Sequence, residues 1–139
     1  MDVKKYFMPT LFVFVVIMIF NIIFHGYIME NLYLSNSHFF RPQDEIQKHR
    51  YFMWIANLIY SFAFCYIYSK GHEKKEDPLA QGIRFGLWMS LLIWLPHTII
   101  NLTIFPYPKS LEVAWLAGYI TQSVLAGITA AVVMAKAKS

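Results

Sequence analysis

The stretch YFMPTLFVFVVIMIFNIIFHGYIM, residues 6–29, decides the fold because its 24 residues include no Asp, Glu, Lys or Arg. A helix rises about 1.5 Å per residue, so about 20 apolar residues cross the hydrocarbon core of a bilayer. A cleaved signal peptide has a shorter apolar region that is followed by a small-residue cleavage site. This stretch runs into His25 and Gly26 instead. We therefore predict a retained transmembrane helix.

Three further stretches of the chain share this lack of charge, and they contain 19, 24 and 23 residues. Only 14% of the 139 residues are charged and 58% are hydrophobic, whereas soluble domains have about a quarter charged residues. The composition excludes a soluble enzyme, a disordered chain and a nucleic-acid-binding domain. We predict an all-α integral membrane protein, a compact four-transmembrane-helix bundle with up-down-up-down topology and a single domain over residues 1–139. The expected spans are about 6–29, 51–69, 83–104 and 111–135.

The 12 Lys and Arg residues are divided unequally between the two ends of the predicted spans. Eight fall on the side of the N-terminus and four on the other side, and the positive-inside rule places the richer side in the cytoplasm. We therefore predict that both termini are cytoplasmic (N-in, C-in), in a bacterial cytoplasmic (inner) membrane. The eight are Lys4, Lys5, Lys70, Lys74, Lys75, Arg84, Lys136 and Lys138, and the four are Arg41, Lys48, Arg50 and Lys109.

Polar side chains inside the spans are the first place to look for a function, because lipid offers them no partner. Counting about 1.5 Å per residue from the helix ends gathers most of them in the outer half of the bundle. We predict one polar intramembrane cluster there, which is a possible ligand or metal site. Its residues are Asn21, His25, Asn57, Ser61, His97, Asn101 and Gln122.

Two members of this cluster, His25 and His97, are candidate ligands for haem iron, copper or zinc, because neutral imidazole is the commonest metal ligand. However, metal sites usually have three or four ligands, and no H-x-x-x-H, E-x-x-H or C-x-x-C spacing occurs. We therefore predict no cofactor, and we expect these side chains to form interhelical hydrogen bonds. The single cysteine, Cys65, excludes an internal thiol pair.

The acidic residues argue against a proton-coupled transporter, which needs a carboxylate inside the membrane. The uncharged stretches contain no Asp or Glu, and Glu30 and Glu112 fall at the predicted outer boundary. We expect both to be solvated or to cap helices. A small oligomeric transporter is therefore the third choice among the functions.

Small residues recur every four positions on the third and fourth spans, a spacing that lets helix backbones approach closely. They either pack neighbouring helices of one chain or present a flat face to a partner protein. This helix-packing set comprises Gly82, Gly86, Ser90, Ala114, Gly118, Ala126, Gly127, Ala130 and Ala131.

The loop from Glu30 to Arg50 is the largest feature outside the predicted spans. Within it, Phe39, Phe40 and Arg41 place two aromatic rings and a cation at the outer surface. They are predicted to form a docking site for a partner or to dip into the lipid interface.

These features favour a non-catalytic accessory, structural or assembly subunit of a larger membrane complex, which packs through its small-residue faces and outer aromatic loop. No P-loop, nucleophile elbow or dinucleotide-binding motif occurs, so we predict that the protein is not an enzyme. The expected partners are the lipid bilayer and other membrane protein subunits, and no nucleic acid. The alternative is a haem- or metal-binding redox or sensing protein that uses His25 and His97.

Overall fold

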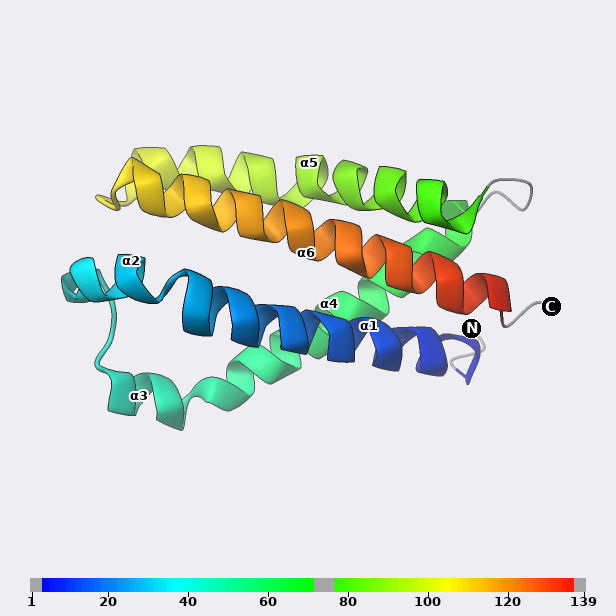
Figure 1. Cartoon of the computed structure of the whole chain (residues 1–139), viewed down its shortest axis with the longest axis horizontal. Helices are drawn as coiled ribbons and strands as arrows, with labels where there is room; N and C mark the ends of the chain where they lie inside the picture. Colours follow the sequence, from blue (N-terminus) through cyan, green and yellow to red (C-terminus); the bar gives the residue numbers. More distant parts are fainter. Residues whose placement is uncertain (1–3, 72–76, 137–139) are drawn as a thin grey trace.

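The computed structural model describes residues 4–71 and 77–136, and its regular structure is helical throughout (Figure 1). Four long helices are each long and apolar enough to cross a membrane, so the chain is a multi-pass integral membrane protein. They are α1 (Lys4–Ile23) with its continuation η1 (Phe24–Ile28), α4 (Arg50–Gly71), α5 (Pro78–Ile104) and α6 (Lys109–Lys136).

The helices extend beyond the uncharged stretches because local chemistry, and not charge, sets their ends. The Asp77 carboxylate accepts a hydrogen bond from the Ala80 amide at 2.9 Å and caps α5, with Pro78 at the first helical position. The carbonyl of Pro108 accepts from the amides of Leu111 and Glu112 at the start of α6. The predicted spans of 83–104 and 111–135 therefore lie within longer helices that begin at Pro78 and Lys109.

Three short helices connect α1 to α4: α2 (Glu30–Ser35), η2 (Ser37–Phe39) and α3 (Gln43–Lys48). They lie at one end of the bundle, which we call the loop end, together with the connection between α5 and α6 (Figure 1). The first and last described residues lie at the opposite end, which we call the terminal end. Successive long helices therefore run in opposite directions.

The closest helix contact joins α5 to α6, and it depends on small residues from both. A Cβ atom on Gly82 would lie 2.6 Å from the carbonyl oxygen of Gly127, and one on Gly86 would overlap the Ser123 carbonyl. Ser90, one turn further along α5, is buried and donates a hydrogen bond to the Gly86 carbonyl at 2.9 Å. Backbone therefore packs directly on backbone along this seam.

The remaining small residues of α6 also pack inside the chain. Ala126, Ala130 and Ala131 are fully buried in a core that includes Phe64 and Tyr68 of α4. Near the loop end, the ring of Phe24 fills the space over Gly118, and the half-buried Ala114 packs against the same group.

The two halves of α4 differ in their packing. Ser61, Phe64, Cys65 and Tyr68 are buried in the second half. In contrast, every side chain in residues 50–59 is exposed except the half-buried Asn57. The helix crosses the bundle obliquely, so that its first half leaves the other long helices (Figure 1).

The seam between α5 and α6 makes Gly86 intolerant of any side chain. We expect Gly86→Ala to destabilise the protein by about 1–3 kcal/mol, the usual effect of overpacking a core, because the new methyl group meets the Ser123 carbonyl. The matched control is Gly26→Ala, since a Cβ at Gly26 meets nothing within 4 Å. The free energy of unfolding of both variants is measured with denaturant in detergent. Equal stabilities would contradict the close backbone contact at Gly86.

Candidate functional site

The polar residues predicted to form one cluster make three separate sets of contacts in the loop-end half of the bundle. The first joins α1 to α4, where the amide of Asn21 donates to that of Asn57 at 3.5 Å. Ser61 is fully buried and donates to the Asn57 carbonyl at 2.7 Å. The Asn21–Asn57 bond is of the interhelical kind that holds membrane helices together, whereas the Ser61 bond lies within α4.

The second set is centred on Tyr33 of α2. Its hydroxyl is hydrogen-bonded to Nδ1 of His25 and accepts a hydrogen bond from the Trp115 indole at 2.9 Å. Burial raises the pKa of the Tyr33 phenol above its ordinary value, although the hydrogen bond from Trp115 opposes the rise. Tyr33 therefore remains a neutral phenol at physiological pH, able to donate and accept at once.

His25 reaches Tyr33 because the chain widens into the π-helical turn η1 before α2 begins. In this turn the Met29 amide donates to the Phe24 carbonyl, five residues back, at 2.9 Å. Such turns insert one extra residue into a helix and often occur at functional sites.

The aromatic residues of the loop, Phe39 and Phe40, pack against other rings at the same end of the bundle. The ring of Phe40 lies 5.4 Å from that of Tyr33 and 6.1 Å from that of Trp115, and Phe39 meets Tyr107 edge-on at 5.6 Å. Both phenylalanines are half-buried. They therefore close the loop end of the bundle, and much of their surface is used within the chain.

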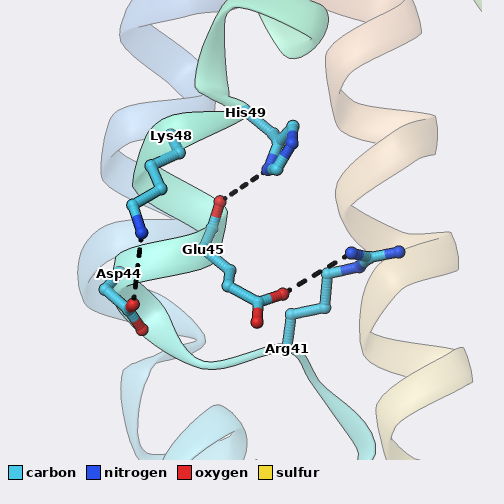
Figure 2. A network of polar contacts seen from close by, with 5 residues as sticks. All are labelled: Arg41, Asp44, Glu45, Lys48 and His49. Carbon is cyan, nitrogen blue, oxygen red and sulfur yellow. Dashed lines mark hydrogen bonds and ion pairs between the residues drawn. The ribbon is translucent and has the colours of Figure 1, made fainter.

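Arg41 and the charged residues of α3 pair locally (Figure 2). Arg41 lies 3.5 Å from Glu45, Lys48 lies 3.7 Å from Asp44, and His49 donates to the Glu45 carbonyl at 2.9 Å. Exposed pairs at this spacing contribute only about 0.3–0.5 kcal/mol each. The network stabilises α3 itself and does not anchor it to the bundle.

The third set lies where α5 ends and α6 begins, and it corrects the expectation for Glu112. This residue is only 1% exposed, so it is not solvated as the sequence had indicated, and its Oε1 atom accepts no hydrogen bond. Its carboxyl group contacts the Asn101 amide and is in electrostatic contact with His97. The Asn101 amide also lies 3.4 Å from Nδ1 of His97.

Glu112 lies in the first turn of α6, next to the uncharged stretch of residues 113–135. The signal for its burial was present in the periodicity of α6. Glu112 precedes Tyr119 by seven residues and Ala126 by fourteen, which places it on the same helix face.

A further polar group lies between α4, α5 and α6, and sequence reasoning missed it. The hydroxyl of Ser123 is bonded to Tyr60 and accepts from the Trp94 indole, each at 3.0 Å. Trp94 also stacks on Tyr119, with ring centres 4.2 Å apart. The polar atoms of Tyr and Trp side chains are a signal that could have indicated these bonds, because a buried phenol or indole usually finds a hydrogen-bond partner. Gln122, a member of the predicted polar cluster, directly precedes Ser123 in the sequence, and its side chain is buried.

His25 and His97 belong to different sets of contacts, so the structure does not bring the two candidate metal ligands into one group. In the part of the chain that the structure describes, no three His, Cys, Asp or Glu residues lie close enough to hold a metal ion.

No protein-family model, curated protein or solved structure matches the chain.

The Ser123 hydroxyl serves partners on two other helices, so its removal has a measurable cost. We expect Ser123→Ala to destabilise the protein by about 1–2 kcal/mol, because two interhelical hydrogen bonds are lost at once. Thr121→Ala is the control, since the exposed Thr121 hydroxyl bonds only to the Ala117 carbonyl of its own helix. The free energy of unfolding of both variants is measured in detergent. An equal loss of stability in the two variants would show that the shared hydroxyl has no special role.

Proposed function

We propose that this chain is a non-catalytic subunit of a larger membrane complex, and that an apolar transmembrane helix of a partner protein packs along residues 50–59 of α4. One observation carries the proposal: this segment is exposed around its whole circumference except at the half-buried Asn57. The other long helices each bury at least one face in the bundle, whereas this part of α4 leaves it. A partner helix would occupy the space beside it.

The composition of this segment supports a protein partner. Tyr51, Met53 and Trp54 are each about half exposed, at 50%, 54% and 51%. Aromatic residues, Met and Arg are enriched at protein–protein interfaces. A large aromatic ring also adds contact area with little loss of side-chain freedom, since it has only two rotatable side-chain bonds.

The partner surface that we propose differs from the surfaces indicated by the sequence. The small residues of α5 and α6 pack against each other or against Phe24, and Phe39 and Phe40 close the loop end. These groups have little area left for a second protein. In the first half of α4, every side chain from 50 to 59 is exposed except that of Asn57, which bonds to Asn21 of α1.

We also propose that both termini face the cytoplasm, in a bacterial inner membrane. The support is the distribution of Lys and Arg in the sequence, with eight residues on the N-terminal side of the predicted spans and four on the other side.

A photo-crosslinking residue at Ile59 of α4 tests the partner. The side chain is 63% exposed, and in native membranes we expect it to crosslink to one discrete membrane protein. The control position is Leu92 of α5, which is 70% exposed and is expected to face lipid and give no adduct. The adduct mass, and native mass measurement after mild-detergent purification, identify the occupant. A monomer without adducts, or equal crosslinking at both positions, would rule the proposal out.

Cysteine labelling tests the orientation, because the native Cys65 is fully buried. We expect a membrane-impermeant maleimide to label Ser37→Cys in intact cells and to label Gly71→Cys only after the membrane is opened. Both sites are exposed, and a Cβ at Gly71 meets nothing within 4 Å. The opposite labelling pattern would reverse the topology.

A further inference from the structure

A cavity of about 160 Å³ lies between α4 and α5, near the end of α4 and the beginning of α5 at the terminal end of the bundle (Figure 1). A single water molecule needs only about 10–15 Å³ of such space, so a group of several non-hydrogen atoms fits. The proposed function uses the other half of α4 and leaves this cavity unexplained. The described residues that line the cavity are Tyr68, Gly71, Gln81, Arg84, Phe85 and Trp88.

Two buried polar residues form part of this lining and hold it in place. Tyr68 and Gln81 are only 1% and 3% exposed, and the Tyr68 hydroxyl donates a hydrogen bond to Oε1 of Gln81. The ring of Phe85 meets that of Tyr68 edge-on, with ring centres 5.2 Å apart. These contacts link α4 to α5 at the cavity. A ligand therefore finds this part of the lining already ordered, which lowers the cost of binding.

Arg84 gives the cavity its charge. It is exposed, and among the described lining residues it is the only one with an ionised side chain. A guanidinium group has five N–H donors in a planar arrangement that matches the oxygens of a phosphate group. With five donors, Arg84 can hold a phosphate group and keep another partner at the same time. The lining therefore favours an anion.

Other described charges at the terminal end also favour an anion. Lys70 in the last turn of α4 and Lys136 in the last turn of α6 are both exposed. The carboxylate of Asp77, which is the described acid nearest to Arg84 in the sequence, accepts a hydrogen bond from the Ala80 amide and caps α5. Basic residues at a membrane surface attract anionic lipids.

An exposed apolar surface begins at the cavity and continues along α5. Trp88 follows Arg84 by four residues, and Leu91 and Leu92 follow it by seven and eight, so these residues share one face of the helix. The three apolar side chains are 65%, 49% and 70% exposed. Tryptophan is enriched where the membrane meets water, because its ring is apolar and its N–H is polar. A charged cavity that continues into an apolar face matches the two parts of a phospholipid.

We propose that the cavity binds an anionic phospholipid, with the phosphate group held by Arg84 and an acyl chain lying along Trp88, Leu91 and Leu92. Free phosphate shares the chemistry of the headgroup, but it would leave the apolar face of α5 uncovered. The lining comes from both α4 and α5, so the bound lipid connects the two helices at the terminal end.

Native mass spectrometry of the full chain in mild detergent tests the site. The probes are phosphatidylglycerol, which has a net negative charge, and phosphatidylcholine, which has none. We expect wild type to bind phosphatidylglycerol about fivefold more tightly, the ratio that corresponds to one basic residue at an anionic membrane surface. Equal affinities would overturn the proposal. Displacement of the lipid by millimolar inorganic phosphate would identify a site for a soluble ion and would also overturn it.

Substitution of Arg84 tests the residue that is assigned to the phosphate group. Since Arg84 is exposed, we expect Arg84→Gln to fold and to lose the about fivefold preference for phosphatidylglycerol, whereas Arg84→Lys keeps part of it. The matched control is Lys109→Gln, which removes an exposed cation at the loop end and is expected to bind both lipids as wild type does. Equal preferences in Arg84→Gln and Lys109→Gln would refute the role of Arg84.

Trp88→Ser tests the position of the acyl chain. It removes an apolar contact and no charge, so we expect it to weaken the binding of phosphatidylglycerol and phosphatidylcholine by the same factor. Trp88→Leu keeps an apolar side chain and is expected to weaken both less. Unchanged binding by Trp88→Ser would show that the acyl chain does not lie along this face of α5.

Discussion

The backbone contact between α5 and α6 sets the positions of the other groups in this protein. Gly82, Gly86 and Gly127 allow the two helix axes to approach until the carbonyl groups of one meet the Cα atoms of the other. Such a contact has no adjustable side chain, so it fixes both the distance and the register of the pair. Trp94 consequently lies opposite Ser123, and Asn101 lies opposite Glu112. A slip of one helical turn, about 5.4 Å, would separate both pairs.

The four long helices could be predicted from the sequence because a membrane span depends only on the summed hydrophobicity of one continuous stretch of residues. Twenty apolar residues are enough to span a bilayer whatever they contact, and charge alone marks where each run ends. The small residues of α5 were also predictable, since Gly82, Gly86 and Ser90 repeat with the period of a helix. The structure agrees with these predictions as far as four candidate spans and internal packing. The helices α5 and α6 begin outside these uncharged runs because capping and proline set the helix ends.

The candidate site was less predictable because it depends on which helix faces meet. Glu112 was expected to be solvated or to cap a helix because of its place near a charged boundary, whereas its burial follows from the face it shares with Tyr119 and Ala126. The single predicted cluster becomes three sets of contacts because Asn57 lies on α4, which diverges from α5, while His25 turns toward α2. Depth in the membrane is a one-dimensional coordinate. It places residues at the same level but does not say which of them are neighbours.

The π-helical turn at Phe24–Ile28 has a consequence for how the chain tolerates changes in length. It holds one residue more than a regular helical turn, and each helical residue advances the chain by about 100° around the axis. Loss of one residue between Phe24 and Met29 would restore a regular α-helix and rotate all of α2 by that angle. Tyr33 would then turn away from Trp115 even though no residue in contact had been altered. In this segment the number of residues, as much as their identity, carries the structural information.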